Sequence, residues 1–137
     1  EAALPSPGAV IPLGLRVLVV DDEPDSREFL QVALENAGAR VTVVESVEAA
    51  LAQFRQQPPD ILLSDIAMPE ADGYSLIQTI RRLPPEQGGQ VPAAALTAFA
   101  RESDKARAIA AGFQLHVPKP LDPDHLIRVV AELARHL

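Results

Sequence analysis

Five short apolar runs, each followed by a stretch with the spacing of a helix, constrain the fold of this chain most strongly. The first run, at residues 15–20, is almost unbroken, as expected of a strand that helices cover on both faces. Further runs predict strands at about 40–44, 61–63, 91–96 and 113–117. Alternating strands and helices indicate βαβ units, whose crossovers are almost always right-handed. The pattern predicts an α/β fold of type (βα)₅, a doubly wound five-stranded parallel sheet in the order 2-1-3-4-5.

The predicted helices carry apolar residues at i, i+3, i+4 and i+7, and glycine or proline ends most of them. The fourth helix, before Gly112, is only weakly amphipathic. Arg81 and Arg82 are expected at a solvated helix end, where positive charge suits the macrodipole. The apolar stripes comprise Leu30, Ala33, Leu34 and Ala37, then Val47, Ala50, Leu51 and Phe54, then Leu76, Ile77 and Ile80, then Ala106, Ile109 and Ala110, and finally Leu126, Val129, Val130 and Leu133.

The first fourteen residues differ from the rest of the chain in their content of proline and glycine. Such residues disfavour both helix and central strand, so residues 1–14 are expected to be a linker. The remaining segment, 15–137, has the size of one ordinary domain. The chain begins with Glu1 rather than methionine, which indicates a segment of a longer protein.

Charge and composition exclude several classes of function for this segment. A net charge of −7 argues against binding nucleic acid, because that mode of binding requires clustered lysine and arginine. No apolar run approaches the ~20 residues of a membrane-spanning helix, so no membrane contact is expected. Without cysteine there can be no disulfide, thiol nucleophile or thiolate metal site, which favours a cytoplasmic location.

Polar residues stand at the carboxyl ends of four predicted strands. Asp21 and Asp22 follow the first, Asp65 the third, Thr97 the fourth and Lys119 the fifth. In open α/β sheets these ends share one edge, where ligands bind. Crowded carboxylates repel one another unless a cation neutralises them, and oxygen ligands of this kind favour Mg²⁺. One carboxylate could then act as a nucleophile toward phosphorus, with the lysine and the threonine hydroxyl contacting phosphoryl oxygens.

Each of these residues taken singly has an ordinary structural interpretation. An aspartate after a strand is most often a turn former or a helix cap, and a lone lysine is most often a solvated side chain. A lone threonine is an unremarkable strand end. Their coincidence on one predicted edge, although they lie up to 98 positions apart, is what favours a functional site.

The chain is similar to the bacterial response-regulator receiver domain. The matching motifs are V-V-D-D-E-P at 19–24, S-D-I-A-M-P-E-A-D-G at 64–73, A-L-T-A at 95–98 and K-P at 119–120. The resemblance implies a flavodoxin-like fold, in which Asp65 is the phosphoacceptor and Thr97 and Lys119 assist it. It further implies that Asp22, Asp65 and the backbone carbonyl of Ala67 bind Mg²⁺, that Asp21 reaches the ion through water, and that the Lys119–Pro120 peptide is cis.

Two departures from the family pattern stand out. His116 occupies the position where the family usually has tyrosine or phenylalanine, so the residue that reports phosphorylation would be atypical. It could equally be an ordinary half-buried histidine, or a switch sensitive to pH near the unperturbed histidine pKa of ~6.5. Ala67 and Phe99 lack polar side chains that could orient a hydrolytic water. The phosphoryl group is therefore expected to be long-lived.

The expected function is Mg²⁺-dependent transfer of a phosphoryl group from phosphohistidine to Asp65, followed by conformational signalling. The expected partners are a histidine kinase or a histidine phosphotransfer domain. The sequence leaves open whether the domain also forms a weak homodimer. The segment around A-G-F-Q-L-H-V-P-K-P is similar to receivers of hybrid sensor histidine kinases, which would place it in the cytoplasmic part of a membrane-bound sensor. The alternatives are an interaction domain that is never phosphorylated, and an aspartyl phosphatase, which would normally have an acid in place of Ala67.

Overall fold

The computed structural model describes residues 10–67, 72–98 and 102–137, and within these ranges five parallel strands form one sheet in the order β2-β1-β3-β4-β5. The strands are β1 (Arg16–Val20), β2 (Arg40–Val44), β3 (Ile61–Asp65), β4 (Ala93–Thr97) and β5 (Leu115–Pro118). The helices are α1 (Pro24–Asn36), α2 (Val47–Gln56), α3 (Gly73–Arg81), α4 (Glu102–Ala111) and α5 (Pro123–Ala134), with a 3₁₀ turn at Pro85–Gln87. The predicted fold class and strand order are confirmed.

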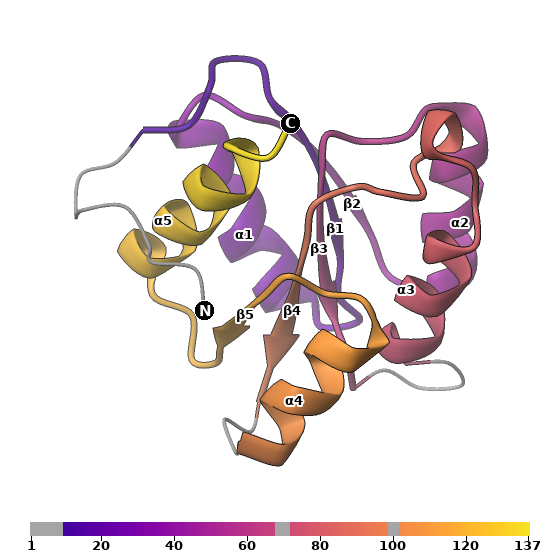
Figure 1. The fold of residues 1–137 in the computed structure, drawn as a ribbon. Helices are drawn as coiled ribbons and strands as arrows, with labels where there is room; N and C mark the ends of the chain where they lie inside the picture. The colour runs from indigo at the N-terminus through magenta and orange to yellow at the C-terminus, as the bar shows by residue number, and fades with distance from the viewer. Residues whose placement is uncertain (1–9, 68–71, 99–101) are drawn as a thin grey trace.

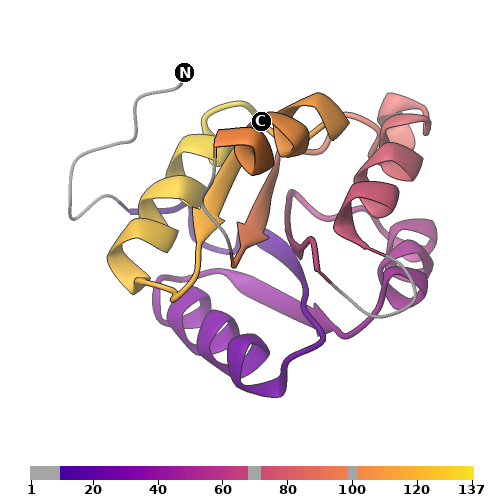
Figure 2. The same cartoon turned by 90° about the horizontal axis from the view of Figure 1, so that it is seen from below.

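The sheet is the middle of three layers (Figure 1). Helices α1 and α5 cover one face, and α2, α3 and α4 lie on the other, as the end-on view shows (Figure 2). In β1, Val17 and Val19 pack toward α1 and α5, whereas Leu18 and Val20 pack toward α2 and α3. A strand covered on both faces needs apolar residues at every position, which explains its unbroken apolar run.

The fourth helix forms where it was expected, but its predicted apolar stripe is wrong. Ala106 and Ala110 are exposed and half of the Ile109 surface is open to solvent, at 51%, whereas Ala108 is fully buried. Alanine is small enough to face either the core or the solvent, so an alanine-rich helix gives little information about its buried side. β5 also begins two residues later than predicted, because Phe113 turns back to the helix and donates its N–H to the Ala108 carbonyl at 3.1 Å.

The packed part of the domain begins before the predicted boundary at Leu15. Ile11 is only 5% exposed and belongs to the core under α1 and α5. A turn returns the chain to the sheet, with the Leu15 N–H donating to the Pro12 carbonyl at 3.2 Å and the Gly14 N–H to the Gly38 carbonyl at 2.8 Å. Proline and glycine here shape a turn, and Ile11 packs against the core from within the segment expected to be a linker.

Arg81 has a structural role that the sequence interpretation missed. Its guanidinium group, at the end of α3, donates to the Gly112 carbonyl at 2.8 and 3.0 Å and to the Gly89 carbonyl at 3.1 Å. It also contacts Gln114 Oε1 at 3.1 Å, and the same oxygen accepts the Ala93 N–H at 2.7 Å. Burial lowers the pKa of Arg81. The side chain therefore ties the ends of α3 and α4 to the start of β4.

Replacing Arg81 is expected to destabilise the fold. Arg81→Met removes charge-assisted hydrogen bonds and leaves carbonyl groups unsatisfied, so the free energy of unfolding should fall by about 2 kcal/mol. Arg82→Met is the matched control, because Arg82 is exposed, and it should change stability by less than about 0.5 kcal/mol. Urea unfolding followed by circular dichroism measures both. Equal stabilities of the two variants would contradict the assigned role of Arg81.

Candidate functional site

The strand ends bring the predicted polar residues together at one edge of the sheet. Asp65 and Thr97 are the last residues of β3 and β4, and Asp21 and Lys119 directly follow β1 and β5. The parallel register pairs Asp65 with Leu96 and Thr97 with Pro118, so the four strands end at a common level. Four positions that are distant in sequence become neighbours because parallel strands share a direction.

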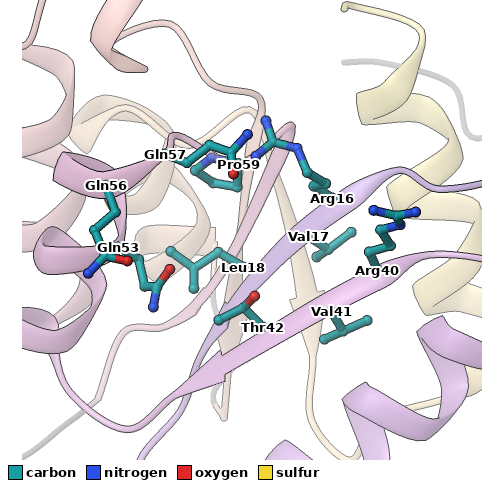
Figure 3. Close-up of a pocket in the computed structure, with 10 residues that line it drawn as sticks. All are labelled: Arg16, Val17, Leu18, Arg40, Val41, Thr42, Gln53, Gln56, Gln57 and Pro59. Carbon is teal, nitrogen blue, oxygen red and sulfur yellow. The ribbon is translucent and has the colours of Figure 1, made fainter.

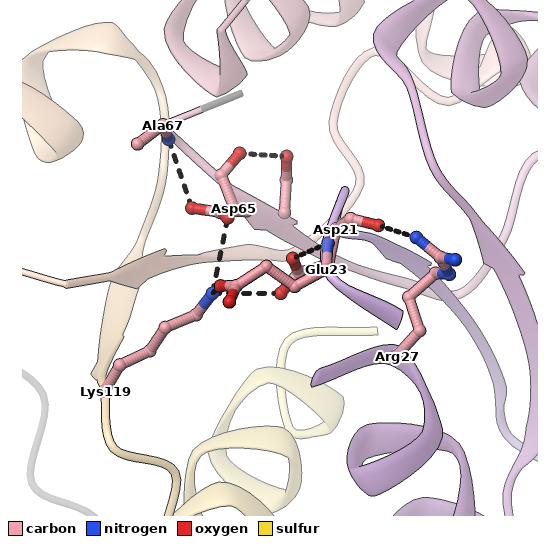
Figure 4. Close-up of polar contacts among 7 residues, drawn as sticks. Asp21, Glu23, Arg27, Asp65, Ala67 and Lys119 are labelled. Atoms are coloured by element: carbon pink, nitrogen blue, oxygen red, sulfur yellow. Dashed lines mark hydrogen bonds and ion pairs between the residues drawn. The ribbon is translucent and has the colours of Figure 1, made fainter. Parts of the chain in front are cut away.

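Lys119 is the centre of this cluster (Figure 4). Its Nζ lies 3.1 Å from Asp21 Oδ2, 3.0 Å from Glu23 Oε1 and 3.3 Å from Asp65 Oδ2. The Asp21 side chain is fully buried and that of Asp65 is 5% exposed, whereas the Glu23 side chain is 62% exposed. An ammonium group has three N–H donors, so each has a carboxylate acceptor within the described part of the chain.

The backbone fixes the position of this lysine. The Lys119 N–H donates to the Thr97 carbonyl at 2.7 Å, which holds the end of β5 against the end of β4. The Lys119–Pro120 peptide is cis, as the resemblance implied. The helix that follows is held by Asp122, which accepts the Asp124 N–H at 3.1 Å as its N-cap. The turn that carries Lys119 is thus held by hydrogen bonds on both sides.

Burial and charge perturb both ionisable groups at the centre. Burial raises the pKa of Asp65, and the charge of Asp21 adds to this effect, while the Ala67 N–H bonded to Asp65 Oδ1 at 3.1 Å and the charge of Lys119 oppose it. Burial by itself would lower the pKa of Lys119, but its hydrogen bonds with Glu23 and Asp21 and the surrounding negative charge raise it above the usual range. Lys119 therefore stays protonated.

The carboxylates have the geometry of a cation site. Asp21, Asp22 and Asp65 each offer one oxygen, and these oxygens lie within 4.8 Å of one another. Asp21 is buried and Asp22 half-buried, so the site is formed by side chains with little access to water. Hard oxygen donors of this kind fit a hard divalent cation such as Mg²⁺. Ala67, which the resemblance adds as a carbonyl ligand, lies two residues beyond Asp65, after the end of β3.

The Thr97 hydroxyl group is buried and has no hydrogen-bond partner within the described ranges. The residue is 1% exposed, and its Oγ1 has no hydrogen-bond partner among the residues that the structure describes. A buried hydroxyl without a partner typically costs about 1–3 kcal/mol. A group that is retained at this cost, on the edge that also carries Asp65 and Lys119, is suited to bind a ligand that enters the site.

His116 lies on the same sheet face as Thr97. It pairs with Ala95 across β4 and β5, and Ala95 and Thr97 share a face because they are two positions apart on one strand. His116 is half-buried. Phe99, the other residue that departs from the family pattern, lies outside the described residues.

Two residues of the site were not expected from the sequence. Arg27, in the first turn of α1, donates to the Asp21 carbonyl at 2.7 Å and lies 3.8 Å from Glu45 at the end of β2. Glu23 donates its backbone N–H to Asp21 Oδ1 at 2.9 Å and contacts Lys119 through its side chain. The D-D-E sequence could have indicated Glu23, but no local pattern marks Arg27, since its partner is a backbone carbonyl.

A cleft of about 350 Å³ lies far from this cluster, among β1, β2 and α2 (Figure 3). Its lining includes Arg16 and Arg40, which begin β1 and β2 and so mark the opposite end of the sheet. The Arg16 guanidinium is already bound to the Pro58 carbonyl at 2.8 Å. The polar residues of the predicted site lie instead at the carboxyl edge of the sheet.

The fold and the carboxylate cluster define a receiver of two-component signalling. Residues 17–131 match the response regulator receiver domain, and the chain belongs to this family. Receiver domains bind Mg²⁺ at an acidic cluster and interact with histidine kinases or phosphotransfer proteins.

Relatives with several architectures share this domain. The chain is 47% identical over 116 residues to an uncharacterised 14.6 kDa protein of Leptolyngbya boryana, covering 85% of this chain and 87% of that protein. It is 36% identical to the KDP operon transcriptional regulatory protein KdpE of Escherichia coli, covering 88% of this chain and 52% of that regulator. It is 35% identical to the sensor histidine kinase GacS of Pseudomonas protegens, covering 84% of this chain and 13% of that kinase.

Solved receiver structures agree with the fold. The receiver domain of the sensor histidine kinase PA1611 from Pseudomonas aeruginosa superposes with a TM-score of 0.81 at 32% identity, covering 89% of this chain and 98% of that one. That structure holds a magnesium ion coordinated in its active-site cleft. The chemotaxis response regulator CheY4 of Vibrio cholerae also gives a TM-score of 0.81, at 25% identity, covering 89% of this chain and 99% of that chain. None of the helices in the described ranges has the length and apolar character needed to cross a bilayer.

Removing the lysine charge should expose the repulsion that it suppresses. In buffer with a chelator, Lys119→Met leaves buried Asp21 without its cation, so the free energy of unfolding should fall by about 3 kcal/mol. Adding Asp21→Asn to that variant removes the uncompensated charge and should restore most of the loss. Urea unfolding of the wild type, both single variants and the double variant gives the coupling free energy between Lys119 and Asp21. A double variant no more stable than Lys119→Met would contradict this account.

Proposed function

We propose that Asp65 accepts a phosphoryl group and that Thr97 and Lys119 hold its oxygens. The unsatisfied Thr97 hydroxyl carries this proposal, because it gives the edge a buried hydrogen-bonding group with no partner in the described structure. The Lys119 ammonium group, 3.3 Å from Asp65, supplies positive charge where a transferred phosphoryl group would develop negative charge. Membership of the receiver family supports the same assignment.

The transfer requires one bond to form and one to break. An Asp65 carboxylate oxygen attacks phosphorus, the P–N bond of a donor phosphohistidine breaks, and the electron pair of that bond returns to the imidazole nitrogen. The Ala67 N–H on Asp65 Oδ1 and Lys119 on Oδ2 orient the carboxylate before the attack. The resulting acyl phosphate lies beside Thr97, whose hydroxyl can donate to it.

The metal assignment is the one that the family resemblance implies, and the cluster of carboxylate oxygens supports it. Asp22 and Asp65 would bind Mg²⁺ directly with the Ala67 carbonyl, and Asp21 would reach the ion through water. When bound, Mg²⁺ would offset the charge of the carboxylates and of the incoming phosphoryl oxygens. Arg27 holds the segment that carries Asp21 and Asp22 by donating to the Asp21 carbonyl. His116 is proposed as the side chain that reports the state of Thr97, since both lie on one sheet face.

The wider context of the domain is also a proposal. The match to 13% of a sensor histidine kinase supports a place within a hybrid histidine kinase, with a histidine kinase or histidine phosphotransfer domain as the phosphoryl donor. A cytoplasmic location follows from this role, and a weak homodimer is compatible with it. The domain would catalyse only its own phosphorylation and dephosphorylation. Mass determination of the full-length gene product tests the hybrid assignment.

Phosphorylation of Asp65 has a direct test. Incubation with acetyl phosphate and Mg²⁺ should add about 80 Da to the intact mass, because the chain gains one phosphoryl group. Asp65→Asn should abolish the addition, and a chelator should suppress it. Asp124→Asn, an exposed aspartate on α5, is the matched control and should react like the wild type. The absence of any metal-dependent adduct would favour the alternative, a docking domain that keeps the fold without phosphorylation.

The lifetime of the phosphoryl group tests the role of Ala67. Its methyl side chain cannot orient a water molecule for attack on phosphorus, so the wild type should lose the group slowly. Ala67→Asn, alone or with Phe99→Glu, should accelerate loss severalfold, measured as the decay of the phosphorylated mass after the donor is removed. Ala67→Val, which adds bulk but no polar group, is the control. Unchanged or slower decay in the double variant would contradict the expectation.

A further inference from the structure

The hydrogen bonds of Lys119 leave no free donor for a phosphoryl oxygen. In the described structure its three N–H groups face Asp21, Glu23 and Asp65 at 3.1, 3.0 and 3.3 Å. An ammonium group has no fourth donor. If Lys119 binds the phosphoryl group, as the proposed function requires, one of its present contacts must be exchanged.

The three contacts differ in the cost of breaking them. Releasing Asp21 would leave a fully buried carboxylate without its cation, and Asp65, at 5% side-chain exposure, is little different. The Glu23 side chain is 62% exposed, so its carboxylate regains water as soon as it leaves. An exposed ion pair typically contributes only about 0–1 kcal/mol. Glu23 is therefore the partner that Lys119 can exchange most easily.

The position of Glu23 also permits the exchange. It precedes the first residue of α1, and its side chain makes no capping hydrogen bond there, so its release disrupts no part of the helix. Its backbone stays in place because its N–H is bound to Asp21 Oδ1 at 2.9 Å. Only the side chain needs to move (Figure 4).

We infer that Glu23 is an intramolecular competitor for the phosphoryl group, occupying one Lys119 donor until a phosphoryl oxygen displaces it. The inference rests on the proposed function and adds a residue that sets how readily the site is filled. The Glu23 carboxylate then opposes binding in two ways, by blocking the donor and by adding negative charge. The two effects can be separated with surface variants.

Three substitutions distinguish the effect of the contact between Glu23 and Lys119 from the effect of the Glu23 charge. Glu23→Ala removes both, whereas Glu23→Asp keeps the charge but shortens the side chain and loses its reach to Nζ. Asp25→Asn removes a charge two residues further along α1 and leaves the Glu23 contact intact, since Asp25 is exposed on the same helix end. Both positions are exposed at the start of α1, so circular dichroism should show an unchanged fold.

The experiment measures the affinity of each protein for beryllofluoride, a phosphoryl analogue, by titration calorimetry at saturating Mg²⁺. Glu23→Asp should bind about threefold more tightly than the wild type and Glu23→Ala at least as tightly as Glu23→Asp, while Asp25→Asn should differ from the wild type by less than about 1.5-fold. High salt should reduce the difference in beryllofluoride affinity between the wild type and the Glu23 variants, because salt screens the exposed ion pair of Glu23 with Lys119. The affinity for Mg²⁺ alone, titrated separately, should be the same in Glu23→Asp and the wild type.

The outcomes separate the inference from the proposed function. If Glu23→Asp binds beryllofluoride like the wild type while Glu23→Ala and Asp25→Asn gain equally, the effect is one of general charge and the inference is overturned. If none of the four proteins binds beryllofluoride, although each binds Mg²⁺, the proposed phosphoryl site itself is overturned. Tighter binding by both Glu23 variants supports a competing contact.

Discussion

The contact of one half-buried ammonium group with three carboxylates is the interaction on which the site depends. Asp21 and Asp65 come from different strands and lie close enough for their charges to repel, and Lys119 lies between them. Removing charges from water is costly, so the cluster persists only because each buried carboxylate also accepts a backbone N–H, from Glu23 and from Ala67. The surrounding loops are arranged to provide those two donors. The sheet fixes the distance between Asp21 and Asp65, and the positive charge of Lys119 offsets the repulsion between them.

The same arrangement accounts for the chemistry that this edge supports. A lysine that stays protonated cannot act as a base, but it can hold an anion. The Thr97 hydroxyl, which has no partner in the part of the chain that the structure describes, can donate to an anion that enters the site. The carboxylate oxygens that repel one another in the free domain are the ligands that a divalent cation requires. The repulsion among these carboxylates and the proposed affinity of the site for a metal and a phosphoryl group therefore have one physical cause.

Much of this could be predicted from the sequence, and the failures have physical reasons. Asp21, Asp65, Thr97 and Lys119 were placed together because each ends an apolar run, and parallel strands bring such ends to one edge. The parts that escaped prediction depend on three-dimensional packing. Arg27 and Arg81 bind backbone carbonyls, which are present at every residue and leave no trace in a sequence pattern. The buried side of α4 could not be identified, because alanine fits both environments. Ile11 was overlooked since the turn that returns it to the core has the composition of a linker.

The separation of the site residues along the chain has a consequence for synthesis. Asp21 and Lys119 are 98 positions apart and Asp65 and Lys119 are 54 apart. Lys119 is therefore the last residue of the cluster to leave the ribosome. Until β5 pairs with β4, Lys119 is not in place, so Asp21 and Asp65 at the ends of β1 and β3 lack its positive charge. Long-range contacts of this kind slow folding, because the chain must lose entropy before they form. If these carboxylates bind divalent cations as proposed, free cations would offset the repulsion between the acidic strand ends until Lys119 is in place.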